Sequence, residues 1–344
     1  MAEIARILVA AVCLRLTAFA ADGPPCTATV LPDGDVQAAI DRPAPGGGRT
    51  HVCLGAGEFH LSRPLAIHRS GVTLRGDGDA TVLRLAPGSE SPVIVVGDQS
   101  ARLPGWITAN VTIADLRIVG QGAAGSEQDR EHPYITNSAV VVRAGRRVGI
   151  RGLDVTACRS ACILTEAGSR DVSIERNRIG GSVWDGISLN RTAKARIAGN
   201  TIHDDTAAGI TAEHLEASVI RENQVTGNKT HGIYLSDSSR NVVTRNRFAG
   251  NVLSGVFVTC AVRDREPAVQ CWPDSMSRGN AFVGNGFVGN RVGFTVAADA
   301  AANCTSPGFV ANVSRGDVFA RQPNEEPDWA RYGRCLRYVD PRAE

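Results

Sequence analysis

Five side chains suited to acid–base chemistry recur at related places in the middle of this sequence. Asp185, Glu213, His231 and Tyr234 each lie within four residues of a glycine in a series repeated every 23 residues, and Arg143 lies further upstream. Imidazole, phenol and carboxyl groups are the usual general acids and bases of enzymes, and a guanidinium can neutralise an acidic substrate group. We therefore take these five residues as candidate catalytic residues.

One reaction that such a set could perform is proton abstraction beside the carboxylate of a uronate sugar. A lyase or an epimerase needs a base, an acid and a cation that neutralises the carboxylate. His231 and Tyr234 would serve as base and acid. The cation would be Arg143, Lys229 or Arg191.

A second reaction, glycoside hydrolysis, needs two carboxyl groups instead of a base and a cation. Glu166 and Glu213 lie about two repeats apart, which corresponds to roughly 9.5 Å between stacked strands. Such a separation is at the upper limit for an inverting hydrolase. A carboxylate or imidazole on a repeat surface can also be an ordinary solvated side chain, so the residue types alone leave the chemistry open.

The elements that would position these residues form a repeat with a fixed period. Two columns, one of asparagines and one of glycines, repeat every 23 residues: Asn177, Asn200, Asn223 and Asn246; Gly186, Gly209, Gly232 and Gly255. A fixed period between 20 and 50 residues indicates a stacked repeat architecture. Asparagine tolerates left-handed turns, and its amide can hydrogen-bond to its copy in the next repeat. The asparagine column is therefore expected to be structural.

Each repeat contains short alternating segments and no helical period. Ile187 and Leu189 are typical, because alternation places both on the same side of a strand. Three such strands with their turns need about 23 residues, which is one coil of a β-helix. Leucine-rich repeats need a leucine frame that is missing here, and propeller blades need about 40 residues. We predict an all-β fold: a single-stranded right-handed parallel β-helix of roughly ten coils.

Both ends of the solenoid are expected to be covered. Asp35 could cap a short amphipathic helix containing Val36, Ala39 and Ile40. Such an N-terminal cap would cover the exposed apolar layer of the first coil. The charged, proline-rich stretch 321–344 is predicted to be a C-terminal cap or tail, and the β-helix domain is predicted to span residues 21–320.

The first 20 residues are predicted to be a signal peptide. An apolar stretch over 7–14 is followed by Ala18, Phe19 and Ala20, which fit the small-x-small cleavage rule. No later apolar run approaches the ~20 residues that a membrane span needs. We therefore expect a secreted or periplasmic protein that does not span a membrane.

The cysteines support an oxidising compartment. Of the nine cysteines, removal of the signal peptide would take Cys13 and leave an even number. Neighbours along a solenoid are also neighbours in space, which favours four pairs: Cys26–Cys53, Cys158–Cys162, Cys260–Cys271 and Cys304–Cys335. Zinc at the Cys158 and Cys162 pair is the weaker alternative, because no second ligand pair is nearby.

Two insertions interrupt the repeat beside the strands that follow the glycine column. They span 120–138 and 261–279. Long loops on one face of a solenoid usually mark its binding face. Neighbouring coils lie about 4.8 Å apart, so a polar patch is expected within roughly 10 Å. Its members are Asp185, Asn190, Glu213, His214, His231 and Tyr234.

The repeat rows resemble a known group of β-helix proteins. They are similar to the repeats of pectate lyases, alginate lyases and alginate epimerases, and to the periplasmic β-helix protein that assists copper-site assembly in nitrous-oxide reductase. The resemblance covers most of the mature chain, but the shared pattern describes mainly scaffold. It implies a β-helix fold and a carbohydrate-active or periplasmic role.

The nearest local resemblance is to mannuronan C5-epimerases. Their active coil carries the sequence YGFDPH, and successive coils carry DGF and RHGF. The matching positions here read DGISLN from Asp185, AGI from Ala208 and THGI from Thr230. Only His231 matches the catalytic pattern, so the resemblance does not support epimerase activity of that family's kind.

The remaining composition excludes several partners. The formal net charge is +2 and no basic run exceeds two residues, which argues against a nucleic-acid partner. No cofactor or metal is predicted; calcium among Asp204, Asp205 and Asn228 fits no known loop spacing. The expected partner is a polysaccharide, as substrate of a lyase, C5-epimerase or hydrolase. The alternative is a non-catalytic carbohydrate-binding, envelope or periplasmic maturation protein.

Overall fold

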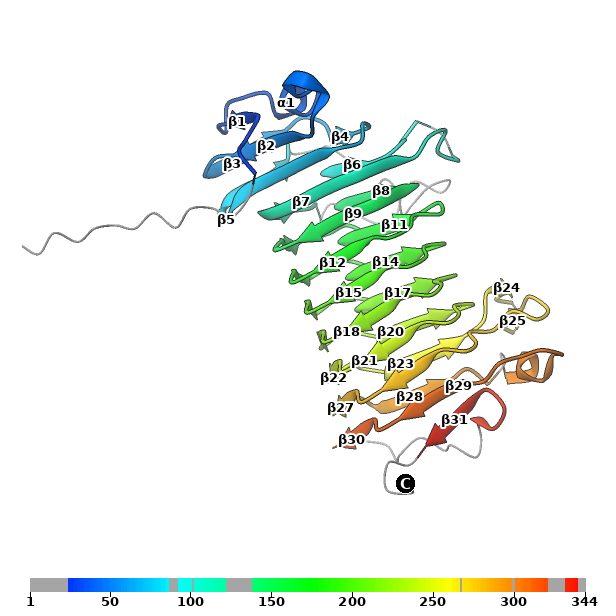
Figure 1. Ribbon diagram of the computed structural model, residues 1–344. Helices are drawn as coiled ribbons and strands as arrows, with labels where there is room; N and C mark the ends of the chain where they lie inside the picture. Colours follow the sequence, from blue (N-terminus) through cyan, green and yellow to red (C-terminus); the bar gives the residue numbers. More distant parts are fainter. Residues whose placement is uncertain are drawn as a thin grey trace, which may run out of the picture.

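Residues 24–86, 92–100, 102–121, 138–266, 268–298, 301–320 and 332–339 are described by the computed structural model. These residues form a stack of parallel coils, with the N-terminal coils at one end and the C-terminal coils at the other (Figure 1). The predicted single-stranded right-handed parallel β-helix is confirmed. The expected signal peptide and most of the expected C-terminal tail lie outside the described residues.

One face of the solenoid is a nine-stranded parallel sheet. Its strands are β4 (Leu65–Ile67), β6 (Ile94–Val96), β8 (Val140–Arg143), β11 (Ile163–Glu166), β14 (Ile187–Asn190), β17 (Ile210–Glu213), β20 (His231–Ser236), β23 (Ser254–Thr259) and β28 (Val292–Val296). Each strand pairs with the equivalent strand of the next coil, as β14 does with β17 and β17 with β20. This sheet follows the glycine column, as predicted.

The other faces form one continuous parallel sheet. Its strands are β1 (Ala28–Val30), β2 (Thr50–Leu54), β3 (Gly57–Leu61), β5 (Val72–Leu85), β7 (Thr108–Val119), β9 (Gly145–Arg151), β10 (Asp154–Thr156), β12 (Ser173–Glu175), β13 (Arg178–Gly180), β15 (Arg196–Ala198), β16 (Thr201–His203), β18 (Val219–Arg221), β19 (Gln224–Thr226), β21 (Val242–Thr244), β22 (Arg247–Ala249), β26 (Ala281–Val283), β27 (Gly286–Val288), β29 (Asn312–Arg315), β30 (Val318–Ala320) and β31 (Leu336–Val339). Among the described residues, only the hairpin of β24 (Val262–Asp264) and β25 (Gln270–Cys271) is antiparallel.

Alternation along each strand separates the core from the surface. Ile187, Leu189 and Ile210 point inward and are fully buried. A buried aliphatic side chain of this size contributes about 1.5–3 kcal/mol. Phenylalanines replace the aliphatic residues in the last coils, where the Phe287 ring stacks on Phe319 with ring centroids 4.7 Å apart. The thin, aliphatic core fits a chain with only 5% aromatic residues.

Buried asparagines hold successive coils in register. In the predicted column, Asn177 Nδ2 donates to Asn200 Oδ1 over 2.9 Å, and Asn200 repeats the contact with Asn223. Each amide also donates to a backbone carbonyl of a buried strand residue, as Asn200 does to Ile174 in β12. The predicted stacking of asparagines is confirmed. The structure adds a second ladder, in which Asn228 Nδ2 donates to Asn251 Oδ1 over 2.9 Å.

The helical elements are few and short. Helix α1 (Val36–Asp41) begins as predicted at Asp35, whose side chain accepts a hydrogen bond from the Ala38 N–H. It lies at the N-terminal end of the stack (Figure 1) and contacts β1, β2 and β4. In the part of the chain that the structure describes, the remaining helical turns are the 3-10 segments η1 (Pro45–Gly47) and η2 (Ala301–Thr305).

The predicted cysteine pairing is confirmed. Four disulfides join the expected neighbours: Cys26–Cys53, Cys158–Cys162, Cys260–Cys271 and Cys304–Cys335. The third ties the hairpin β24–β25 to the end of β23, beside the nine-stranded sheet. Within the described ranges, no helix has the length and apolar character needed to cross a membrane.

Candidate functional site

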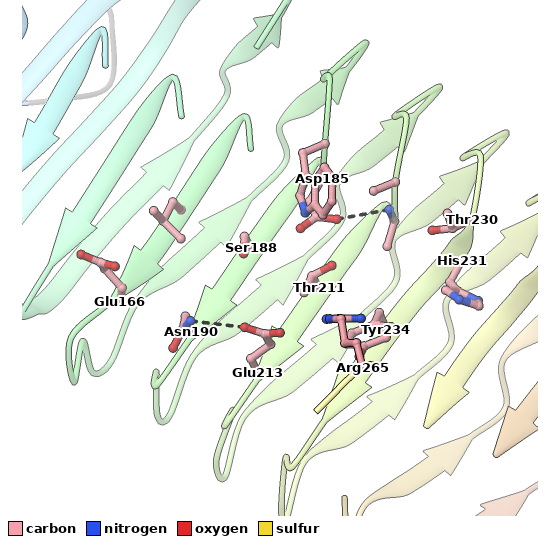
Figure 2. Close-up of a pocket in the computed structure, with 14 residues that line it drawn as sticks. Glu166, Asp185, Ser188, Asn190, Thr211, Glu213, Thr230, His231, Tyr234 and Arg265 are labelled. Carbon is pink, nitrogen blue, oxygen red and sulfur yellow. Dashed lines mark hydrogen bonds between the residues drawn. The ribbon is translucent and has the colours of Figure 1, made fainter. Parts of the chain in front are cut away.

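The outer face of the nine-stranded sheet carries a pocket of about 290 Å³ over β11, β14, β17 and β20. Its volume lies near the lower end of the range for small-molecule sites. Figure 2 shows its polar side chains arising from successive coils, with Glu166 toward one end and His231 toward the other. Four of the five predicted catalytic residues line it: Asp185, Glu213, His231 and Tyr234.

The strand register explains why these residues converge. Thr211 pairs with Ser188 on one side and with Tyr234 on the other, and Glu213 pairs with Asn190. Residues two apart on a strand point to the same face, so Thr211 and Glu213 both face the pocket. The register therefore forms two outward columns on this face, one with Ser188, Thr211 and Tyr234 and the other with Asn190 and Glu213.

Asp185 lies just before β14, at the edge of the pocket, and is 2% exposed. Its carboxylate accepts hydrogen bonds from the Ala208 N–H over 3.2 Å and from the Thr211 hydroxyl. Burial raises the pKa of the Asp185 carboxyl to about 7, and the nearby Glu213 carboxylate adds to the rise. Near neutral pH this carboxyl therefore exists in both its protonated and ionised forms.

Glu213 lies at the end of β17, and its carboxylate accepts a hydrogen bond of 3.3 Å from the Asn190 amide (Figure 2). Burial raises the pKa of Glu213, while the charges of His214 and Arg265 act in the opposite direction. Thr211 stands between Glu213 and the carboxyl of Asp185. The pocket thus contains two carboxyl groups held by different neighbours.

Three rings form a stack at the other end of the pocket. The His231 ring lies on Phe257 with centroids 4.5 Å apart, and Tyr234 stacks on Phe257 at 5.5 Å. Burial lowers the pKa of His231 to about 4, which makes its imidazole neutral at neutral pH. Its Nδ1 atom is buried and has no hydrogen-bond partner in the described part of the chain. Burial and the Glu213 charge raise the pKa of Tyr234.

Arg265 and Trp184 also line the pocket, and neither was predicted from the sequence. Arg265 belongs to the insertion 261–279, which was expected to border the site, and its charge lowers the pKa of both Glu213 and Tyr234 against the effect of burial (Figure 2). Trp184 is 41% exposed and precedes Asp185. The available signal for Trp184 was its place in the sequence, directly before Asp185 and the repeat glycine Gly186. Arg265 gave none, because an insertion has no repeat register.

Arg143 is in register with Glu166 on the outer face of the sheet, but the segment of Asp98 and Arg102 covers it, so that it is 1% exposed. Its Nε atom is 2.5 Å from Glu166 Oε1, and its other nitrogens donate to the carbonyls of Asp98 and Arg102 over 2.7 Å each. Arg143 therefore acts on the pocket through Glu166, which lines it. Its guanidinium does not face the cavity as a free cation.

The other residues considered from the sequence lie elsewhere. His214 turns away after β17 with a positive φ of 55°, and its Nδ1 is 3.0 Å from Asp237 Oδ2. Arg191 lines a different hollow together with His214, and Lys229 does not line the pocket. The insertion 120–138 falls outside the described residues except at its ends.

Asp205 is buried behind the pocket and belongs to the second asparagine ladder. Its Oδ1 accepts hydrogen bonds from the Ser182 hydroxyl over 2.7 Å and N–H over 3.0 Å, and its N–H donates to Asn228. Oδ2 has no partner in the described part of the chain. Burial raises the pKa of Asp205 to about 8, and the Asp185 charge adds to the rise. Of its two neighbours before it in the chain, His203 ends strand β16 and Asp204 is exposed.

Solved structures with the same fold come from several kinds of protein. The A-module of a mannuronan C-5 epimerase from Azotobacter vinelandii is 14% identical, with a TM-score of 0.52 over 89% of this chain and 93% of that one. An alginate lyase from Paenibacillus gives 13% identity and a TM-score of 0.59 over 88% and 99%. A surface adhesin of Streptococcus pneumoniae gives 13% and 0.62 over 85% and 75%. At these identities the likeness shows the fold alone.

A search of curated proteins finds no match, whereas one family model does match. It covers residues 110–308 and is described as "Periplasmic copper-binding protein (NosD)". Copper in proteins is bound by imidazole, thiolate or thioether groups. In the described part of this chain every cysteine is in a disulfide, Met276 is buried at 1% exposure, and no three His, Cys, Asp or Glu side chains converge. These residues do not fit a copper site.

The match extends over more than half of the chain. It begins within β7, ends after η2 and includes every strand that contributes to the pocket. The same range contains the asparagine ladders and the glycine column that define the coils. This chain therefore belongs to the NosD family of periplasmic β-helix proteins.

Proposed function

We propose that this protein acts on a polysaccharide in the pocket of the nine-stranded sheet, by acid–base hydrolysis of a glycosidic bond. The observation that carries the proposal is the pair of carboxyl groups, Asp185 and Glu213, on either side of Thr211 in an open pocket. A glycosidase needs one protonated carboxyl as acid and one ionised carboxylate as base or nucleophile.

The environments of the two carboxyl groups suggest which plays each part. Asp185, with its pKa raised to about 7, would be the acid. Glu213 would be the ionised partner, because Arg265 favours its charged form. Thr211, whose hydroxyl donates to Asp185, lies two residues before Glu213, and two residues along a strand span about 7 Å between their backbones. Inverting enzymes separate their two carboxyl groups by about 6.5–9.5 Å, and retaining enzymes by only about 5–5.5 Å.

The charge of the pocket favours a neutral or cationic sugar. Glu166, Asp185 and Glu213 supply carboxyl groups, and Arg265 is the one cationic lining residue among those described. A uronate would bring a further negative charge beside Glu213. Lyase or epimerase chemistry at His231 and Tyr234 would need a cation for that carboxylate, and Arg143 is engaged by Glu166.

A non-catalytic role is the second candidate, and one observation favours it. The family model that matches residues 110–308 is described by binding rather than by a reaction. In this case the same pocket would hold a sugar or another ligand without changing it, as part of an envelope or periplasmic maturation function.

A substrate screen separates these candidates. Purified mature protein is incubated with neutral glucans, chitosan, alginate and pectate; released reducing ends report hydrolysis, and absorbance of unsaturated uronates reports lyase action. We expect reducing ends from a neutral or amino-sugar polymer, lost in both Asp185→Asn and Glu213→Gln. Unsaturated products would contradict hydrolysis. Binding without turnover, weakened by Glu213→Gln, would support the non-catalytic role.

A further inference from the structure

A second hollow lies on a different face of the solenoid, over its N-terminal coils. It has a volume of about 390 Å³ and opens on the outer surface of β2, β5, β7 and β9. Its polar lining consists of Arg49, His51, Thr73, Arg75, Thr112 and Arg151. No acidic side chain is part of the lining within the described chain.

The strand register places these residues in two neighbouring outward columns. His51 pairs with Thr73, which pairs with Thr112. The adjacent column contains Arg75 and, two coils further, Arg151. Those two arginines are about 10 Å apart along the stack, which is within reach of two guanidinium groups turned toward one ligand.

Among the described residues, Arg49 and Arg75 lack the carboxylate partners that surface arginines elsewhere in this chain possess. Arg49 donates to the Asn110 carbonyl over 2.9 Å, and Arg75 contacts the Cys53 sulfur at 3.7 Å. In the described ranges neither lies within 4.0 Å of a carboxylate oxygen. Arg151 has Asp115, with its NH1 3.5 Å from Oδ2. By contrast, Arg84 on the same strand β5 is 2.5 Å from Glu58.

His51 adds an unsatisfied polar atom at the same place. Its Nδ1 is buried and has no hydrogen-bond partner among the described residues. Burial and the charges of Arg49 and Arg75 lower the pKa of His51. The hollow thus contains two arginines without a carboxylate partner among the described residues, Arg49 and Arg75, beside a neutral imidazole and two threonine hydroxyls that are available to a ligand.

We propose that this hollow binds a phosphate- or sulfate-type oxyanion. Guanidinium groups match the oxygens of such anions through paired hydrogen bonds, and several of them converging from different strands suit a tetrahedral group better than a planar carboxylate. The threonine hydroxyls and His51 supply the neutral contacts. The anion is either a soluble ion or the headgroup of an acidic phospholipid, since both present the same phosphate oxygens.

Calorimetric titration of the mature protein with inorganic phosphate and with sulfate tests the site. We expect binding that weakens by about tenfold or more in Arg75→Gln and in Arg49→Gln, because each loses a charge-assisted contact. Arg84→Gln, on the same strand but already paired with Glu58, should bind as the parent does. Acetate should bind more weakly than phosphate.

Vesicle sedimentation then identifies the source of the anion. A lipid headgroup would be assigned if the protein binds phosphatidylglycerol vesicles but not phosphatidylcholine vesicles, and if Arg75→Gln loses this binding. A soluble ion would be assigned if only inorganic phosphate binds. The proposal is overturned if neither phosphate nor sulfate binds at millimolar concentration, or if both arginine variants bind as the parent does. Arg49 is exposed, so Arg49→Gln remains an informative variant if Arg75→Gln fails to fold.

Discussion

The guanidinium of Arg143 lies against the carboxylate of Glu166, with 2.5 Å between Nε and Oε1, and Arg143 is 1% exposed. Removing one partner of a buried ion pair leaves the other charge without compensation. We expect Arg143→Ala to lower the free energy of unfolding by about 3 kcal/mol. Urea denaturation followed by circular dichroism measures this loss.

An exposed ion pair on the same solenoid provides the control for Arg143. Arg196 pairs with Glu175 on the surface, where its side chain is 50% exposed. Surface pairs contribute at most about 1 kcal/mol. If Arg143→Ala were no more destabilising than Arg196→Ala, the burial of the Arg143 pair would not matter to stability.

Asp205 occupies an asparagine position in a buried ladder, which predicts a stabilising substitution. In Asp205→Asn, Oδ1 can still accept from Ser182, and Nδ2 can donate where Oδ2 has no partner among the described residues. Equivalent amides donate to a carbonyl 26 residues upstream, as Asn251 does to Val225, which here corresponds to Ile179. We expect a gain of about 1 kcal/mol near pH 8, measured by urea denaturation.

The same substitution should also change how stability depends on pH. The pKa of Asp205 is raised from 3.8 to about 8, so the folded state keeps a proton that the unfolded chain releases above pH 3.8. The stability contributed by the protonated carboxyl is complete below that pH and is lost as pH rises through about 8. Asp205→Asn should flatten this decline. An equally steep decline in the variant would contradict the raised pKa.

The sequence predicted those parts of the molecule that follow the 23-residue period. Strand pairing repeats from coil to coil, so Asp185, Glu213 and Tyr234 could be aligned on one face from the sequence alone. The ladder position of Asp205 was also accessible, because Asn228 lies one repeat later. The sequence interpretation instead compared Asp205 and Asn228 only as possible calcium ligands.

Contacts made by irregular segments could not be predicted in this way. Arg265 enters the pocket from an insertion that has no counterpart in other coils. Arg143 has an outward position on its strand, yet the carbonyls of Asp98 and Arg102 cover its guanidinium. The 23-residue period determines whether a side chain points outward or inward from the sheet. The burial of an outward side chain depends on which non-repeating segment covers that side chain.

The proposed acid sets the expected pH dependence of activity. Asp185 must be protonated to donate to the leaving group, and burial raises its pKa to about 7. Turnover should therefore fall as pH rises through about 7, and Asp185→Asn should lower the rate by about a hundredfold or more. Rates measured from pH 5 to pH 9 by released reducing ends test this. If the rate instead showed no fall between pH 6 and pH 8, the acid would be another group.

Trp184 is expected to bind the apolar face of a sugar ring at the edge of the pocket. It is 41% exposed although it lines the cavity beside Asp185. We expect Trp184→Ala to raise KM or Kd by about tenfold with little change in stability, because an exposed ring contributes mainly to ligand contact. Trp272, also exposed but outside the pocket lining, supplies the control variant. Equal effects of both substitutions would exclude a specific role for Trp184.

Replacing the carboxyl pair and the ring pair separately distinguishes hydrolysis from proton abstraction. Glu213→Gln should lower hydrolysis by about a hundredfold or more, because the amide cannot act as a base. Tyr234→Phe keeps the ring stack on Phe257 and should retain activity within a few-fold. His231→Ala removes a ring stacked at 4.5 Å on Phe257 and should cost about 1 kcal/mol of stability. The opposite result would be loss of activity in Tyr234→Phe and retained activity in Glu213→Gln. It would assign the pocket to lyase or epimerase chemistry, with the neutral imidazole of His231 as the base.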